Sequence, residues 1–319
     1  MKKILLLVVL LTSCAAAAPR AGDETQAGKG GAAATAAAPS SKVDAEQMLG
    51  DVRALASDAM EGRAAGTPGA ARARAYLLGR FEQAGLKPLG ASFEQGFKLD
   101  GRGQGEAQGV NLVGHVAGRR TPARLVVVTA HYDHLGVKGG QVYNGADDNA
   151  SGVAALLQLA ADFARRPPAH TVVFAALDAE ESGLRGAHAL VESLKREGRA
   201  VALNVNLDMV GHSERGELYA AGAHHTPALR PVLEKVAAGA RVKLLLGHDR
   251  PELGGGDWTK QSDHYAFHRE KIPFVYFGVE DHKDYHRPTD DFETLTADFY
   301  VRAVETILEA VAALDENMN

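Results

Sequence analysis

The chain has 319 residues, of which 45% are hydrophobic and 24% are charged, and its formal net charge at pH 7 is −5. These proportions are typical of a globular protein and exclude a collagen-like chain, a coiled coil and a wholly disordered protein. A protein that binds nucleic-acid phosphates usually carries a basic excess, so the acidic balance argues against nucleic acid as a partner.

The N-terminal segment has the features of a secretion signal. Met1-Lys2-Lys3 is a short basic start, and the apolar run Ile4 to Leu11 is too short for a permanent membrane span. The following Leu11-Thr12-Ser13-Cys14 resembles a bacterial lipobox, in which Cys14 carries the lipid. We therefore expect residues 1–13 to be a signal peptide. The protein would then be an exported, membrane-anchored lipoprotein that faces the periplasm or the cell exterior. A plain signal peptide cleaved a few residues later, with Cys14 lost, is the alternative.

Residues 14–42 consist mainly of Ala, Gly, Ser, Thr and Pro and offer almost nothing to bury. This composition predicts a disordered tether. Because Cys14 is the only cysteine, residues 43–319 contain no disulfide and no thiolate ligand for a metal. We expect residues 43–319 to form one domain.

Beyond the tether, helical and strand-like patterns alternate. In chain order they predict two helices (43–59, 70–84), two strands (110–116, 125–130), a helix (153–163), a strand (171–177), a helix (186–197), a strand (203–210), a helix (227–238), a strand (272–278) and a closing helix (296–314). The runs at 125–130 and 171–177 are almost entirely apolar, as in strands that are buried on both faces. The alternation predicts an α/β fold, a three-layer α/β/α sandwich around a largely parallel, mixed central sheet.

Acidic residues and histidines gather where the predicted strands end. In chain order they are His131 and Asp133, Asp147 and Asp148, Glu180 and Glu181, Asp208, and His286. Open α/β sheets bind their ligands outside the carboxyl ends of the strands. We therefore expect these side chains to meet at one edge of the sheet.

Several of these residues also have an ordinary structural explanation. Asp147 and Asp148 could cap the next helix, because Asp favours that position. Glu180 and Glu181 could be acids in a first helical turn, where the helix dipole favours them. His131 could be a hydrogen-bonded histidine at a strand end, and a loop histidine such as His286 could be solvated.

Taken together, the residues fit a metal site better than they fit separate explanations. Asp208 lies in an apolar strand, where a carboxylate without a partner is costly to bury. Asp133 stands close enough to His131 to orient its ring, which is a common arrangement around metal-ligating histidines. Two histidines and three carboxylates could hold two divalent cations, because the carboxylates and one hydroxide would balance the cations' charge.

Six motifs carry the candidate residues, namely Thr129-Ala130-His131-Tyr132-Asp133-His134-Leu135-Gly136, the run 144–152, Asp178-Ala179-Glu180-Glu181-Ser182-Gly183, Asn206-Leu207-Asp208-Met209, Ser262-Asp263-His264 and Tyr285-His286. In order and spacing they resemble the zinc aminopeptidases of the M28 peptidase family over about residues 45–315. A family-like segment, Met60-Glu61-Gly62-Arg63 with Gly66-Thr67-Pro68-Gly69, precedes them. The resemblance implies the zinc-exopeptidase (phosphorylase/hydrolase-like) fold and hydrolysis of the N-terminal bond of peptide substrates.

The resemblance also implies two zinc ions per chain. His131 and Asp208 would hold one ion, Glu181 and His286 would hold the other, and Asp148 would bridge them.

The same resemblance assigns the remaining roles at the site. Asp147 competes with Asp148 for the bridging position, but the family's spacing to the small-Ser-Gly run favours Asp148. Glu180 would be the general base. Tyr285 matches a tyrosine that polarises the substrate carbonyl in some members of the family.

Three other functions compete with an aminopeptidase. A carboxypeptidase on the same fold would need a basic clamp, for which Arg250, Lys260 and Arg287 are the nearby candidates. A glutaminyl cyclase, which is a mono-zinc acyltransferase of the same superfamily, often differs after the bridging Asp, whereas the run 149–152 is peptidase-like. A non-catalytic binding lipoprotein would have lost ligands, and here all of them are present.

The segment 244–267 contains a Gly-rich loop, which we expect to form part of the substrate pocket. Trp258 or Tyr265 would be its wall, and a mobile surface loop is the alternative. Several other histidines have no comparable partner in the sequence and are expected at the surface or in packing, namely His170, His188, His224, His225, His248, His268 and His282.

Overall fold

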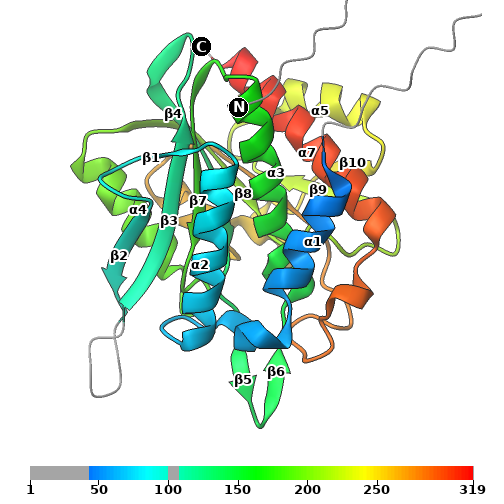
Figure 1. The fold of residues 1–319 in the computed structure, drawn as a ribbon. Coiled ribbons are helices and arrows are strands. Elements are labelled where there is room, and N and C mark those ends of the chain that lie inside the picture. Colours follow the sequence, from blue (N-terminus) through cyan, green and yellow to red (C-terminus); the bar gives the residue numbers. More distant parts are fainter. Residues whose placement is uncertain (1–42, 100–107, 319) are drawn as a thin grey trace, which may run out of the picture. The chain divides into compact units, whose positions relative to one another are not determined.

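The computed structural model describes residues 43–99 and 108–318. In these residues nine strands form one mixed sheet, with helices packed on both of its faces (Figure 1). The strand order is β1-β3-β7-β4-β8-β11-β9-β10, and β2 pairs with β3. The strands are β1 Lys87–Pro88, β2 Glu94–Lys98, β3 Gln108–Val116, β4 Thr121–His131, β7 His170–Leu177, β8 Ala200–Leu207, β9 Glu217–Ala221, β10 Lys243–Leu246 and β11 Phe274–Gly278. A separate hairpin joins β5 Gly136–Lys138 to β6 Gln141–Tyr143.

The four strands at the centre of the sheet, β7, β4, β8 and β11, are parallel to one another. On one side β3 pairs with β7 in the antiparallel sense, and on the other side β9 pairs with β11 in the antiparallel sense. The expected three-layer fold with a largely parallel, mixed sheet is therefore confirmed. Because the central strands are parallel, their carboxyl ends reach the same edge, and the residues that follow them meet there.

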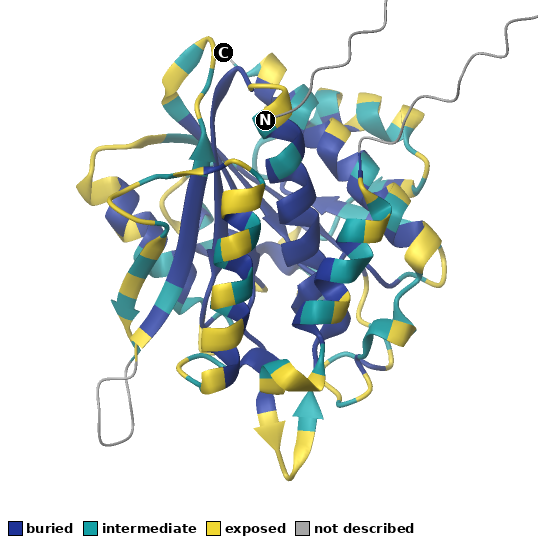
Figure 2. Cartoon of the chain, in the orientation of Figure 1, coloured by how far each residue is buried: buried dark blue, intermediate teal, exposed yellow. Residues whose placement is uncertain are grey.

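Two hydrophobic cores lie on opposite faces of the sheet. In β4, Val126 and Val128 belong to one core, and Leu125 and Val127 belong to the other. The first core is covered by α1 Ala45–Leu55, α2 Pro68–Gln83, α3 Gly152–Arg165, α5 Arg230–Gly239 and α7 Ala297–Asn317, and the second by α4 Arg185–Arg196 and α6 His264–Arg269. Figure 2 shows the central strands buried and exposed positions on the outward sides of α1 and α2. This alternation explains why the run in β4 is apolar at nearly every position.

The first two helices begin at capping residues. The Asp44 side chain accepts a hydrogen bond from the N–H of Gln47 at the start of α1. Thr67 accepts from the N–H of Ala70, and Pro68 occupies the first turn of α2. Between these helices the short turn η1 (Asp58–Arg63) carries the chain past the edge of the sheet where the strand ends gather.

No helix in the described part of the chain is long and apolar enough to cross a membrane. The expected signal peptide (1–13), Cys14 and the tether up to residue 42 lie outside the described residues. The boundaries of these segments therefore remain predictions.

Candidate metal centre

A cavity of about 310 Å³ lies at the carboxyl ends of the parallel strands. It is lined by His131, Asp148, Glu180, Glu181, Asp208, Met209, Trp258, Gln261, Tyr276, Val279, Asp281, Tyr285 and His286. The structure thus brings together the seven residues that the sequence suggested as ligands or catalytic groups.

Different elements deliver these side chains to the cavity. His131 is the last residue of β4, and Asp208 directly follows β8. The sequence predicted that this strand would run to residue 210, whereas β8 ends at Leu207. Asp208 therefore lies just beyond the ladder, where its side chain can turn into the cavity. Asp148 belongs to the turn η2 (Ala146–Ser151) that precedes α3, and its peptide bond to Asn149 is cis.

The carboxylate of Asp148 lies between two histidines. Its Oδ1 is 3.4 Å from Nε2 of His131, and its Oδ2 is 3.0 Å from Nε2 of His286. On the first side, Oδ1 of Asp208 is 3.2 Å from Nε2 of His131. On the second side, Oε1 of Glu181 is 3.5 Å from Nε2 of His286. Two groups of donor atoms therefore share one carboxylate.

These two groups have the composition and spacing of zinc ligands. Zinc is bound by histidine nitrogen and carboxylate oxygen, and two ligands of a tetrahedral ion stand about 3.3 Å apart. The separations around Asp148 are close to that value. Oε1 of Glu181 is buried beside two imidazole nitrogens, at 2.8 Å from Nδ1 of His134 and 3.5 Å from Nε2 of His286. The residues present therefore fit zinc.

Asp147, the competitor for the shared position, points elsewhere. Its Oδ1 accepts hydrogen bonds from the N–H of Gly211 at 2.7 Å and from the hydroxyl of Ser151 at 3.0 Å. Its Oδ2 faces Nε2 of His282 at 3.2 Å. The geometry therefore favours Asp148 as the shared carboxylate.

Two buried carboxylates hold the backbone of the acidic pairs in place. The oxygens of Asp133 accept hydrogen bonds from the N–H groups of Glu180 and Glu181, at 3.0 and 3.4 Å. The oxygens of Asp290 accept from the N–H groups of Asp147 and Asp148, both at 3.0 Å. Oδ1 of Asp133 is also 3.7 Å from Nδ1 of His131, and the backbone carbonyl oxygen of Asp133 is 3.1 Å from the same nitrogen. Its carbonyl therefore orients the imidazole more closely than its side chain does.

One buried histidine was not singled out from the sequence. His134 is 1% exposed, and its Nδ1 lies 2.8 Å from Oε1 of Glu181 and 3.8 Å from Oδ2 of Asp148. The only sequence signal was its place three residues after His131 in the same motif. His134 is thus a further nitrogen donor beside the second group.

Burial and charge shift the pKa values in the cavity in opposite directions. Burial, together with nearby carboxylates such as Asp263, holds the pKa of Glu180 well above its usual value. Burial likewise raises the pKa of Asp263 to about 8. For Glu181 burial also raises the pKa, but hydrogen bonds from His134 and His286 outweigh it and lower the pKa below the usual range. The pKa values of these adjacent glutamates are therefore shifted in opposite directions.

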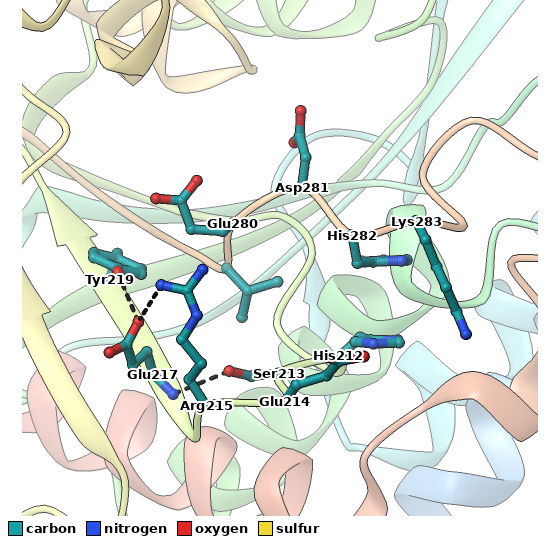
Figure 3. Close-up of a pocket in the computed structure, with 11 residues that line it drawn as sticks. His212, Ser213, Glu214, Arg215, Glu217, Tyr219, Glu280, Asp281, His282 and Lys283 are labelled. Carbon is teal, nitrogen blue, oxygen red and sulfur yellow. Dashed lines mark hydrogen bonds and ion pairs between the residues drawn. The ribbon is translucent and has the colours of Figure 1, made fainter.

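A second cavity, of about 390 Å³, adjoins the first and shares Val279 and Asp281 with it. Figure 3 shows His212 and His282 on one side of it and Glu217 and Tyr219 on another. The two imidazole rings are stacked 4.1 Å apart with an angle of 4° between their planes. Parallel rings direct their nitrogen lone pairs side by side rather than toward one point, so this pair fits a packing contact better than a shared metal.

Three of the histidines that have no comparable partner in the sequence stand beside carboxylates in the structure. His282 faces Asp147, His170 lies 2.9 Å from Asp315, and His248 lies 3.2 Å from Glu280. In each pair the two members are far apart along the chain. The sequence did not reveal these partners because only the tertiary structure brings them together.

The Gly-rich loop contributes one wall of the first cavity. Trp258 lines it and stacks on His248 with 3.8 Å between ring centroids. Tyr265, the alternative wall residue, is not among the lining residues. Tyr276 of β11 lines the cavity beside Trp258, at 5.6 Å between rings, and was not anticipated.

Comparison with known proteins adds a family and several relatives. A sequence model of peptidase family M28 matches residues 111–311. A probable zinc metalloprotease of Leptosphaeria maculans is 40% identical over 113 residues, which are 34% of this chain and 26% of that protein. Aminopeptidase YwaD of Bacillus subtilis is 30% identical over 201 residues, which are 59% of this chain and 40% of that protein. The chain therefore spans less than half the length of these curated relatives.

Solved structures of two kinds of enzyme share the fold. The LapA aminopeptidase of Legionella pneumophila superposes with a TM-score of 0.68 at 19% identity, covering 87% of this chain and 74% of that one. The glutaminyl cyclase of Bacteroides thetaiotaomicron superposes with a TM-score of 0.67 at 19% identity, covering 87% of this chain and 99% of that one. At these identities the likeness shows the fold alone.

Proposed function

Because this chain belongs to peptidase family M28, we propose that it is a zinc aminopeptidase that hydrolyses the N-terminal peptide bond of peptides. The observation that carries the proposal is the carboxylate of Asp148, whose two oxygens face His131 and His286 separately. A single carboxylate between two sets of donors could bind a cation on each side, as a two-metal site needs.

Each side of Asp148 would hold one ion. His131 and Asp208 would complete the first set, and Glu181 and His286 the second. Zinc bound there would supply the Lewis acidity that polarises a carbonyl and lowers the pKa of a water toward about 7.

Glu180 and Tyr285 would act directly on the reacting groups. The raised pKa of Glu180 suits a general base, which takes a proton from the attacking water and returns it to the departing amine. Burial raises the pKa of Tyr285 as well, so that its hydroxyl stays protonated. From its place in the cavity wall, that hydroxyl can donate a hydrogen bond to the substrate's carbonyl oxygen as it becomes negative.

The charge of the cavity favours a substrate with a free amine. Its lining contains five carboxylates, those of Asp148, Glu180, Glu181, Asp208 and Asp281, and neither Lys nor Arg. Three of these carboxylates would be offset by the two cations they hold, which leaves Glu180 and Asp281 to attract a protonated α-amine. Because the lining has no Lys or Arg, no basic clamp faces a C-terminal carboxylate, which disfavours a carboxypeptidase. The adjoining cavity of about 390 Å³ offers room for further residues of a peptide.

The proposal is tested on chain 43–319, purified without chelator. We expect about two zinc ions per chain, by analogy with two-metal sites, and release of nitroaniline from aminoacyl-nitroanilides but not from their N-blocked equivalents. One zinc or none, with cyclisation of a peptide that begins with Gln, would instead identify a glutaminyl cyclase. Cleavage of N-blocked peptides from their C-termini would identify a carboxypeptidase.

We also propose that the enzyme acts outside the cytoplasm as a lipoprotein, on the basis of residues 1–14. Metabolic labelling with a fatty acid should modify the full-length chain and not its Cys14→Ala variant. An unlabelled wild-type chain would contradict the anchor and leave the proposed activity untouched.

A further inference from the structure

The least exposed cation described in the structure lies behind the candidate metal centre. Arg63 is 0% exposed, and its guanidinium donates hydrogen bonds to four backbone carbonyls. Nε donates to the carbonyl of Tyr132 at 2.8 Å, and Nη2 donates to that of Gly145 at 3.0 Å. Nη1 donates to the carbonyls of Leu55 and Asn144, both at 2.6 Å. One side chain therefore ties three segments together.

Two of those segments carry candidate metal ligands. Tyr132 stands between His131, which is the last residue of β4, and Asp133, which binds the backbone of the two glutamates. Asn144 and Gly145 directly precede the turn that contains Asp148. Because a peptide unit is planar, holding these carbonyls orients the backbone of the neighbouring residues as well. Arg63 thus links the backbone on the His131 side of the centre to the backbone on the Asp148 side.

Lysine could not replace this arginine. A guanidinium presents five donors in a rigid planar fork, whereas an ammonium is a compact point charge with three. Burial lowers the pKa of Arg63 to about 10, against the opposing effect of the carboxylates of Asp148 and Asp290. The group therefore remains a cation at neutral pH. Its hydrogen bonds hold the backbone carbonyls, and its positive charge interacts favourably with the nearby carboxylates.

The backbone that delivers Arg63 has an unusual conformation. Glu61, Gly62 and Arg63 have φ values of 51°, 62° and 52°, all in the left-handed region that residues other than glycine rarely adopt. A Cβ atom on Gly62 would lie 2.4 Å from the carbonyl oxygen of Tyr143, so only glycine fits there. Such conformations persist only where the surrounding structure imposes them, and they concentrate at functional sites.

We propose that Arg63 is a positioning residue for the metal centre, setting the spacing between the loop of His131 and the turn of Asp148 through their backbone carbonyls. This inference rests on the proposed function, because it concerns how the same site is assembled. Arg63 touches neither substrate nor metal in this proposal.

The test is the zinc affinity of the Arg63→Lys variant of chain 43–319, measured on metal-depleted protein by competition with a zinc indicator. We expect zinc to bind about 10–100-fold more weakly, as is usual when residues that orient metal ligands are changed. The matched control is Arg80→Lys. Arg80 is another largely buried arginine, whose Nε lies 2.7 Å from Oδ1 of Asp51, and it joins α2 to α1 away from the cavity.

The control should lose thermal stability and keep the wild-type zinc affinity. If Arg63→Lys also loses only stability, Arg63 is an ordinary structural residue and the inference is wrong. If the wild-type chain itself binds no zinc, the proposed function fails first, and the two failures are thereby distinguished.

A second measurement needs no variant and covers the case in which Arg63→Lys does not fold. Binding free energies are reciprocal, so zinc should stabilise the segment that holds its ligands in place. In hydrogen–deuterium exchange of the wild-type chain, zinc should slow exchange in 58–63 together with 131–134 and 144–148. Protection of the two ligand segments without any change in 58–63 would overturn the inference.

Discussion

Oδ2 of Asp147 faces Nε2 of His282 at 3.2 Å, while the neighbouring Asp148 turns both of its oxygens toward the candidate metal centre. The two adjacent aspartates thus point in different directions from one turn and make different contacts. The first joins the turn to the loop that follows β11, and the second lies between the two sets of donors.

This division predicts different outcomes for two equally small substitutions. Asp148→Asn should remove most of the bound zinc and reduce activity by about 10³-fold or more, because both ions lose a ligand. Asp147→Asn should keep the zinc content and cost about 1–3 kcal/mol of stability, because a buried hydrogen-bonding group is changed. Metal analysis and thermal unfolding of both variants check this. Loss of zinc from Asp147→Asn with full zinc in Asp148→Asn would reverse the assignment.

A second pair of substitutions distinguishes the proposed general base, Glu180, from the proposed zinc ligand, Glu181. Glu180→Gln should retain zinc and lose about 10²–10⁴-fold in kcat, because an amide cannot accept the proton. Glu181→Gln should lose zinc, since its carboxylate is the donor that faces His286 on the second side of Asp148. Zinc content and kcat are measured on the same preparations. Equal loss of metal from both variants would refute the division of roles.

The sequence predicted the central elements well because long patterns leave little ambiguity. The apolar runs 125–130 and 171–177 lie within β4 and β7, and helix 153–163 lies within α3. The short strands β9 and β10, with five and four residues, were missed. A run as short as Lys243–Leu246 is too brief for periodicity to distinguish it from a loop.

The sequence predicted those parts of the candidate site that follow from the order and direction of the strands. Residues that follow parallel strands meet at one edge, so His131, Glu180 and Asp208 could be grouped from the sequence. Asp290 could not, because it acts on the N–H groups of Asp147 and Asp148, which lie far earlier in the chain. No local pattern marks a contact of that kind.

The wall of the first cavity leads to a prediction on specificity. Trp258 lines the cavity, whereas Tyr265 does not. Trp258→Leu should therefore change the ranking of kcat/KM among N-terminal residues, by about 10-fold or more for large side chains, a typical effect of removing an apolar contact with the substrate's side chain. Tyr265→Leu is the matched control and should leave the ranking unchanged. A panel of aminoacyl-nitroanilides measures both, and an unchanged ranking in Trp258→Leu would exclude this wall from the pocket.

The last prediction concerns acid stability and a histidine outside the metal centre. His264 is fully buried, its Nε2 lies 3.0 Å from the carbonyl of Trp258, and its ring stacks on Tyr276 at 4.7 Å. Burial lowers the pKa of His264 to about 3, against an ordinary value of 6.5. The unfolded chain therefore binds a proton on this residue at a higher pH than the folded protein does. Its contribution to stability is complete above pH 6.5 and is lost as the pH falls toward 3.

Replacing His264 by Gln, which can still donate to the carbonyl, removes this titration. The variant should be less stable than wild type at pH 8, because the ring's packing is lost. Its free energy of unfolding should fall less steeply between pH 6.5 and pH 4. Both chains are compared in chelator, so that release of zinc does not contribute, by urea unfolding across that range. Parallel stability curves for the two chains would show that His264 titrates normally, whereas converging curves establish it as a source of acid lability.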